Sequence, residues 1–479
     1  MFEKINEWIK WLDGAIWGLP LIIFILAAGI FMTIRLGGLQ IRKLPKALKY
    51  MVKNEEGGHG EVSSFGALCT ALSATIGTGN IVGVATAVVA GGPGALFWMW
   101  IAAFFGMATK FSEGVLAIKY RHICEDGHVL GGPFYYIEKG MGKRWKWLAK
   151  LFAFFGMCVG LFGIGTFTQV NGISSAVKNF FDADSRHTVN LFGAEYSYTV
   201  IIAGVIVAVC VALVILGGLG RIAQVSQIVV PFMAIIVVPF MAIIYVVFCV
   251  LLLGFNYQAI PNALAAIVEG AFNPQAVTGG IVGSIAIAMQ MGIARGIFSN
   301  EAGLGSAPIA AAAAKTKEPV RQGLVSMTGT FIDTIVICTM TGLCIVITGS
   351  WNVGLEGVAV TTRAFQNGLP FDPKIASFIL MACLVFFAFT TILGWDYYGE
   401  RCLEYFSGGS QKAVLIYRWL YILAVFFGPY MTVEAVWNIA DIFNGLMAFP
   451  NLIAIVALSG VVCKETRDYF KRLKERSDI

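Results

Sequence analysis

The segment from Ala74 to Asn80 has the residue types of a binding site inside a long apolar stretch, because two glycines and three hydrogen-bonding side chains lie within seven residues. In a membrane an unpaired backbone group costs several kcal/mol, so a helix break is tolerated only where it lines a site. A break here would leave the amides of Gly77 to Asn80 at the start of a half-helix, whose positive end can hold a carboxylate. The carbonyls of Ser73 to Ile76 would end the preceding half-helix and suit a cation. The alternative is a glycine-lined packing face between helices.

A second segment of the same kind lies near residue 300. Its glycines bracket four polar or charged residues: Gly292, Gly296, Gly303 and Gly305 surround Arg295, Ser299, Asn300 and Glu301. Each of the two breaks would open a block of five helices, which is how an inverted-repeat transporter places its central site. The two blocks show no convincing sequence identity, so the repeat is inferred from the placement of the breaks. Packing alone explains the pair less easily than it explains one such segment.

The composition indicates a lipid environment for most of the chain. Of the 479 residues, 58% are hydrophobic and 13% are charged, and the mean hydropathy is +0.77, so a water-soluble globule would lack polar surface to cover itself. The ten cysteines are scattered without a CxxC pair or a Cys/His cluster, so neither a disulfide framework nor a zinc site is indicated. An enzyme is disfavoured because no nucleophile with a base and no phosphate-binding loop is found. A channel is disfavoured because no repeated filter is found.

A helix needs about 20 apolar residues to cross the hydrocarbon core of a bilayer. This length predicts an all-α, polytopic membrane protein with eleven spans, near residues 15–36, 64–90, 93–119, 147–177, 197–217, 227–254, 279–313, 322–349, 374–400, 412–428 and 434–462. The whole chain, residues 1–479, would be one transporter domain. Its expected parts are an extra N-terminal helix at 15–36, a first inverted repeat at 64–254, a second at 279–462 and a cytoplasmic tail at 463–479.

Lysine and arginine collect in alternate loops, at 36–63, at 119–146 and in the tail after residue 463. Because positively charged loops stay in the cytoplasm, the sequence predicts a plasma-membrane protein with its N-terminus outside and its C-terminus in the cytoplasm. The excess of lysine and arginine in these loops accounts for the net charge of +6. No nucleic-acid partner is therefore indicated, and the expected partners are the lipid bilayer and a small substrate.

Residues 229–236 read VVPFMAII, and residues 237–244 repeat the same eight letters. A helix from 227 to 254 would be roughly 42 Å long at 1.5 Å per residue, well over the hydrocarbon thickness. One copy would leave about 20 residues, which fits a bilayer. The pattern indicates a duplication in the gene or in the sequence record.

Several segments, in order along the chain, resemble the alanine or glycine:cation symporter family. They are SATIGTGNIVGVA, GGPGALFWMWIAAFFGMATKF, GGPFYYIEKG, ARGIFSNEAGLGSAP, FIDTIVICTMTG and GWDYYGER. The resemblance runs from about residue 15 to 462. It implies the LeuT-like fold of the amino acid, polyamine and organocation superfamily, with one extra helix ahead of the core. It also implies a symporter for alanine or glycine, with Na⁺ as the coupling ion or H⁺ in some members.

By similarity to sodium symporters of this fold, one Na⁺ site would combine hydroxyls of the ninth span with carbonyls at the first break. The residues so implied are Ser73, Thr75, Ile76, Ala388, Thr390 and Thr391. Na⁺ binds hard oxygen ligands, which these residues offer. The alternative is that the two ninth-span threonines bond carbonyls of their own helix. Asp333 is the rival candidate for an ion ligand.

The amino-acid pocket is expected between the two breaks. The substrate carboxylate would lie at the amides of the first break and the ammonium near carbonyls of the second, with walls from the fourth and ninth spans. The expected substrate-binding residues are Gly77, Thr78, Gly79, Asn80, Phe167, Gln169, Asn171, Ile297, Ser299 and Trp395. The aromatic residues among them have packing as the alternative role. A small pocket would exclude larger side chains by sterics alone.

Charged residues inside the spans are costly unless they are paired or hydrated. Lys110 and Glu113 lie three residues apart and are expected to pair or to reach the interface. Arg295 is expected to pair with Glu301 or Asp333.

Overall fold

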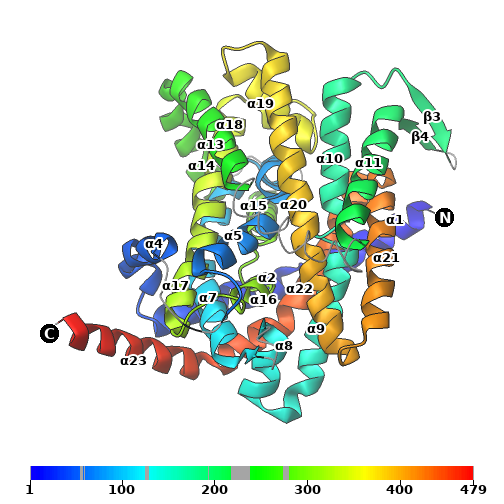
Figure 1. Cartoon of the computed structure of the whole chain (residues 1–479). Coiled ribbons are helices and arrows are strands. Elements are labelled where there is room, and N and C mark those ends of the chain that lie inside the picture. Colours follow the sequence, from blue (N-terminus) through cyan, green and yellow to red (C-terminus); the bar gives the residue numbers. More distant parts are fainter. Residues whose placement is uncertain are drawn as a thin grey trace.

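The chain folds into a bundle of helices (Figure 1). The structure is a computed structural model that describes residues 2–53, 58, 60–123, 129–191, 194–216, 238–272 and 280–477. Within these residues the strands form two antiparallel hairpins, β1 (His122–Ile123) with β2 (Val129–Leu130) and β3 (Thr188–Leu191) with β4 (Ala194–Ser197). The helical fold class is confirmed, and the hairpins are additions in the connections.

The helices of the first half follow the predicted spans with short helices between them. They are α1 (Phe2–Ile16), α2 (Leu19–Arg35), α3 (Leu39–Arg42), α4 (Leu44–Val52), α5 (Ser64–Thr75), η1 (Gly79–Gly83), α6 (Val84–Gly91), α7 (Gly94–Tyr120), α8 (Pro133–Tyr136), η2 (Ile137–Met141), η3 (Lys143–Trp145), α9 (Lys146–Phe162), α10 (Phe167–Phe181) and α11 (Tyr198–Leu216).

The helices of the second half end in a long tail helix, which lies across the end of the bundle near α7 and α17 (Figure 1). They are α13 (Val238–Phe255), η5 (Tyr257–Ala259), α14 (Ile260–Phe272), α15 (Gly280–Asn300), α16 (Ala307–Ala311), α17 (Pro319–Thr330), η6 (Phe331–Cys338), α18 (Thr339–Ile347), η7 (Ser350–Asn352), α19 (Val358–Gly368), α20 (Pro373–Ser407), α21 (Gln411–Phe427), η8 (Gly428–Tyr430), α22 (Val433–Ala457) and α23 (Ser459–Ser477).

Helix α5 begins at a serine cap and stops in the middle of the bundle. Ser63 Oγ accepts a hydrogen bond from the Gly66 N–H at 2.9 Å, which satisfies one free amide at the helix start. The helix ends at Thr75, because Ile76 has an extended backbone with φ −76° and ψ 97°. The chain resumes in the π-helical turn η1 and in α6, bent by 54° from α5. The predicted break between Ala74 and Asn80 is therefore confirmed.

The second predicted break is present at residues 301–306, between the end of α15 at Asn300 and the start of α16 at Ala307, whereas Gly292, Gly296 and the residues between them lie inside α15. Glu301, Gly303 and Gly305 have φ values of 55°, 88° and 85°, a backbone region that costs a non-glycine residue about 1–3 kcal/mol. A third interruption was not expected. Residues 163–166 separate α9 from α10, although the stretch Lys143–Phe181 that contains both helices is long and apolar enough to cross a membrane, as predicted for 147–177.

Among the described residues, eight helices are long and apolar enough to cross a membrane, or up to ten if each of two bent pairs counts as one span. The number of eleven spans stays a prediction. The first copy of the repeated octapeptide and the first residue of the second copy lie outside the described residues, and α13 begins at Val238 within the second copy.

Large apolar side chains on the outer helices point away from the bundle. Ile202 and Leu213 on α11 are 56% and 65% exposed, and Ile243 on α13 is 62% exposed. Apolar area in water costs about 25 cal/mol per Å², whereas lipid tails remove that cost. Together with the apolar helices, these faces describe a multi-pass membrane protein. Inside them, α7 packs on α15 and α17, and α9 packs on α20 and α22, so the two broken helices are enclosed.

Candidate functional site

The amides at the first break are bonded to side-chain amide oxygens. The Gly77 N–H donates to Asn80 Oδ1 at 3.0 Å, and the Thr78 N–H donates to Gln169 Oε1 at 3.1 Å. Thr78, Asn80 and Gln169 are buried. The half-helix formed by η1 and α6 therefore begins among polar groups in the middle of the bundle. The side-chain oxygens that accept from the Gly77 and Thr78 amides are neutral, so among the described residues no negatively charged group bonds these two amides at the positive end of this half-helix.

The Thr391 hydroxyl joins helix α20 to the end of α5. Its Oγ1 lies 3.2 Å from the Ser73 carbonyl oxygen, 3.4 Å from that of Ile76 and 3.0 Å from the Phe387 carbonyl of its own helix. A hydroxyl and three carbonyl oxygens thus lie close together at the break. These are hard oxygen donors, the ligand type that suits Na⁺. The structure brings Thr391 to Ser73 and Ile76, as the resemblance implied, and their role as ligands stays a prediction.

The neighbouring hydroxyls do not point to the same place. Thr390 Oγ1 donates within α20 to Phe386 at 3.1 Å and to Phe387 at 2.9 Å, which is the alternative considered for it. Thr75 Oγ1 donates within α5 to the Ala71 and Leu72 carbonyls. Ala388 is fully buried on α20. Of the expected ligand side chains, Thr391 alone has a hydroxyl contact across the break in the part of the chain that the structure describes.

Asp333, on the π-helical segment η6, links the two breaks. Its Oδ1 accepts from Asn80 Nδ2 at 2.7 Å, and its Oδ2 accepts from the Ser299 and Thr334 hydroxyls, each at 2.8 Å. The side chain is fully buried, and no Lys or Arg nitrogen of the described residues forms an ion pair with it. Three hydrogen bonds therefore stabilise this carboxylate. Through it, Asn80 of the first break and Ser299 of α15 are held in fixed positions.

The second break is held by a carboxylate and a tryptophan. The Trp395 Nε1–H donates to Glu301 Oε1 at 3.0 Å, and the Ser306 hydroxyl donates to Glu301 Oε2. Trp395 and Glu301 are buried. Trp395, expected as a wall of the pocket, therefore fixes the strained residue of the break.

Comparison with known sequences identifies the family. Residues 2–237 and 235–479 match the sequence model of the sodium:alanine symporter family. The chain belongs to this family. The two matched stretches meet at residues 235–237, inside the repeated octapeptide. Family membership makes the chain a cation-coupled amino-acid symporter.

Known relatives span almost the whole chain. The symporter is 54% identical to an uncharacterized transporter of Haemophilus influenzae, over 97% of this chain and 96% of the relative. It is 45% identical to the sodium/alanine symporter AgcS of Methanococcus maripaludis, over 96% of each. The structure of MhsT in complex with L-phenylalanine matches with a TM-score of 0.54 at 11% identity, covering 85% of this chain and 98% of that one. This likeness shows the fold, and the predicted LeuT-like fold is confirmed.

The partner of Arg295 in the symporter differs from both expected partners. Its guanidinium forms two hydrogen bonds with Asp441 on α22, at 2.9 and 2.6 Å, and lies 4.5 Å above the Trp437 ring. The expected pairing with Glu301 or Asp333 is wrong. Asp441 and Trp437 lie four residues apart on α22 and therefore share a helix face.

Lys110 and Glu113 of the symporter also have other partners. The Lys110 ammonium donates to the Asn300 carbonyl at 2.8 Å, and Glu113 Oε1 accepts from Asn451 Nδ2 at 2.7 Å. Both are buried, with 3% and 1% of their surface exposed. The expectation that they pair with each other or reach the interface is wrong.

Three expected pocket residues lie away from the first break or have other contacts. Asn171 Nδ2 donates to the Met431 carbonyl at 2.9 Å, so it faces η8. Phe167 packs against Phe162, with ring centroids 5.8 Å apart. The Ile297 carbonyl accepts the Glu301 N–H at 2.8 Å. Residues that the sequence analysis did not place at the site are Thr334, Phe298 and Trp437; the Phe298 and Trp437 rings pack against each other with centroids 4.5 Å apart and planes tilted by 46°.

Proposed function

We propose that the symporter couples inward movement of Na⁺ to uptake of a small neutral amino acid such as alanine. The observation that carries this proposal is the Thr391 hydroxyl, which lies within 3.4 Å of the Ser73 and Ile76 carbonyl oxygens across the break. A Na⁺ ion there would take the carbonyl and hydroxyl oxygens as ligands. The 45% identity to the sodium/alanine symporter AgcS supports the same choice of ion and substrate.

The substrate would bind next to the ion, at Gly77 to Asn80. Its carboxylate would take the place of the neutral Asn80 and Gln169 oxygens at the amides of the half-helix, where a negative charge is favoured. The space is small, since a Cβ on Gly79 would lie 3.0 Å from Ser299 Cα. A small side chain such as that of alanine or glycine suits such packing.

Gly77 lies between the two proposed sites, and this arrangement supports coupling. A Cβ at this position would lie 2.6 Å from Thr391 Oγ1 and 2.9 Å from Gln169 Oε1. The backbone that presents the Ile76 carbonyl to the ion is therefore continuous with the backbone that presents the Gly77 and Thr78 amides to the substrate. When both ligands favour the same backbone conformation, each raises the affinity of the other by the same factor.

Thr391→Val tests the ion site, because valine keeps the shape of threonine and removes the hydroxyl. We expect the Na⁺ concentration that half-saturates alanine uptake to rise about tenfold. This corresponds to a loss of about 1.4 kcal/mol of Na⁺ binding free energy when the hydroxyl ligand is removed from the cation. Thr390→Val is the matched control, since its hydroxyl bonds only its own helix. Uptake by proteoliposomes at several Na⁺ concentrations is the measurement.

Unchanged Na⁺ dependence in Thr391→Val would contradict the ion site and make Asp333 the better candidate. The alternative function is a proton-coupled symporter of the same fold. Uptake driven by a pH gradient and insensitive to replacement of Na⁺ by choline would support that alternative.

We also propose that the N-terminus lies outside and the C-terminus in the cytoplasm. Cysteines introduced at the exposed Tyr257 and at Lys471, with Cys124, Cys210 and Cys463 replaced by serine, test this. Because the intervening spans would place the two sites on opposite sides, a membrane-impermeant maleimide should label Tyr257→Cys in intact cells and Lys471→Cys only after permeabilisation. Labelling of both from one side would contradict the eleven-span topology.

A further inference from the structure

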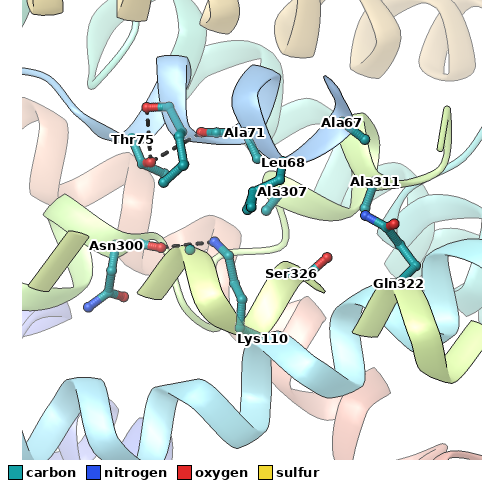
Figure 2. Close-up of a pocket in the computed structure, with 12 residues that line it drawn as sticks. Ala67, Leu68, Ala71, Thr75, Lys110, Asn300, Ala307, Ala311, Gln322 and Ser326 are labelled. Atoms are coloured by element: carbon teal, nitrogen blue, oxygen red, sulfur yellow. Dashed lines mark hydrogen bonds between the residues drawn. The ribbon is translucent and has the colours of Figure 1, made fainter. Parts of the chain in front are cut away.

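A small, mostly apolar pocket with a few polar side chains lies directly beyond the two breaks, toward the end of the bundle where α23 packs on α7 and α17. It is enclosed by α5, α7, α16 and α17. Thr75 and Asn300, the last residues of α5 and α15, both line it. Figure 2 shows Lys110 reaching from α7 to Asn300, with Thr75 and Ala71 of α5 on the opposite side. The pocket therefore adjoins the proposed substrate site without being part of it.

The charged residue of this pocket is Lys110. Its ammonium donates one hydrogen bond, to the Asn300 carbonyl at 2.8 Å, and no carboxylate of the described residues lies within ion-pair distance. The negative end of the α15 dipole stabilises a cation at this place. An ammonium has three N–H donors, so this one retains capacity for a further acceptor. A cation buried in a span is costly, and such residues usually mark a ligand pathway.

Two further polar side chains line the pocket without hydrogen-bond partners among the described residues. Gln322 is 1% exposed, and its Oε1 has no donor. The Ser326 hydroxyl, one turn along α17, is drawn pointing into the pocket (Figure 2). A buried carbonyl oxygen without a donor costs about 1–3 kcal/mol. Positive charge, a hydroxyl and an unused acceptor thus surround one space.

We propose that this pocket is a second substrate site, which binds the zwitterionic amino acid after it leaves the breaks. Lys110 and Ser326 would bind the carboxylate, and Gln322 Oε1 would accept a hydrogen bond from the ammonium. This rests on the proposed function, because the ligand is the amino acid that the central site releases. Chloride could also bind Lys110 and Ser326, because it carries the same negative charge as the carboxylate. It has no N–H group to donate to Gln322 Oε1, so the zwitterionic amino acid matches all three side chains better.

The pocket must widen before an amino acid can enter. Its α16 wall consists of Ala307 and Ala311, and its α5 wall combines Ala67 and Ala71 with Leu68, Leu72 and Thr75. Helix α5 is joined to η1 and α6 through the bend at residues 76–78. A tilt of α5 about this bend would open the pocket and connect it to the proposed cytoplasmic side.

Binding and uptake measured on the full chain in proteoliposomes separate this site from the central one. Lys110→Met removes the charge at similar length, and Lys110→Arg keeps the charge as the matched control. We expect Lys110→Met to keep Na⁺-dependent alanine binding within about threefold and to lower the uptake rate at least about tenfold, with Lys110→Arg within about threefold of wild type. Gln322→Met and Ser326→Ala should lower uptake at least about threefold, and they decide the question if Lys110→Met does not fold.

Three results would overturn the proposal. The first is wild-type uptake in Lys110→Met. The second is an equal loss of binding and uptake in Lys110→Met and Lys110→Arg, which would make Lys110 a support for the end of α15. The third is a wild-type uptake that falls when gluconate replaces chloride, with no such fall in Lys110→Met, which would identify the occupant as chloride. If instead the proposed Na⁺-coupled alanine symport were wrong, the wild-type chain would show no Na⁺-dependent alanine binding. That result differs from all three results above.

Discussion

Replacing Gly77 by alanine is expected to abolish most alanine uptake. The added Cβ would lie 2.6 Å from Thr391 Oγ1 and 2.9 Å from Gln169 Oε1. Neither atom can move away freely, because the first is close to three carbonyl oxygens and the second is bonded to the Thr78 amide. Overpacking of this kind costs about 1–3 kcal/mol, so we expect Na⁺-dependent uptake to fall about 10- to 100-fold.

Gly83→Ala is the control in the same segment. A Cβ there would lie 3.4 Å from the Trp437 ring, an ordinary contact, and Gly83 is helical. Alanine is favoured over glycine inside a helix by up to about 1 kcal/mol, so we expect near wild-type uptake and unchanged or higher stability. Proteoliposome uptake over a range of Na⁺ concentrations is the measurement. Normal uptake by Gly77→Ala would contradict the proposed position of ion and substrate on either side of this glycine.

The breaks could be predicted from the sequence because their cause is local. Glycines and polar side chains inside an apolar stretch, as at Ala74 to Asn80, weaken the helix at the residues that carry them. The same local reasoning does not say where a hydroxyl points. Thr390 and Thr391 are adjacent and identical in type, but the first bonds its own helix and the second reaches α5. The 100° rotation per residue of a helix separates them, and only the packing of α20 on α5 decides which one faces the break.

The partners of the buried charges could not be predicted. Arg295 pairs with Asp441, 146 residues away, and Trp395 donates to Glu301, 94 residues away. These distances along the chain are bridged by tertiary packing, on which helical periodicity within one span carries no information. The pairing expected for Lys110 and Glu113 failed for the related reason that each side chain bonds a partner on another helix.

Asp333 shows how the missed contacts complete the predicted ones. Sequence reasoning placed Asn80 and Ser299 at one site but supplied no contact between them. The carboxylate of η6 accepts from both, so two hydrogen bonds connect α15 to the first break and would carry a movement of one to the other. Coupling between the breaks then has a physical path through a buried, hydrogen-bonded anion.

Arg295→Met is expected to destabilise the protein strongly. The Arg295–Asp441 pair has 7% and 3% of its side-chain surface exposed, and removing one partner of a buried pair costs about 3–5 kcal/mol because the other charge is left unpaired. The free energy of unfolding, measured by titrating a denaturing detergent into the purified protein, should fall by that amount. Lys10→Met is the control, since the Lys10–Glu434 pair is 71% and 58% exposed and such pairs contribute about 0–1 kcal/mol.

The double variant Arg295→Met with Asp441→Leu separates two contributions to the free energy of unfolding. One is the destabilisation caused by the unpaired Asp441 carboxylate, and the other is the stabilisation that the intact ion pair provides. Replacing a whole buried pair by apolar residues of similar volume is often neutral or stabilising, so we expect the double variant to regain most of the stability that Arg295→Met loses. The Trp437 ring, which lies 4.5 Å from the guanidinium, can pack against either a cation or a methionine thioether. If the double variant were as unstable as Arg295→Met, the loss would have a cause other than the charge of Asp441, such as the lost contact of the arginine with Trp437.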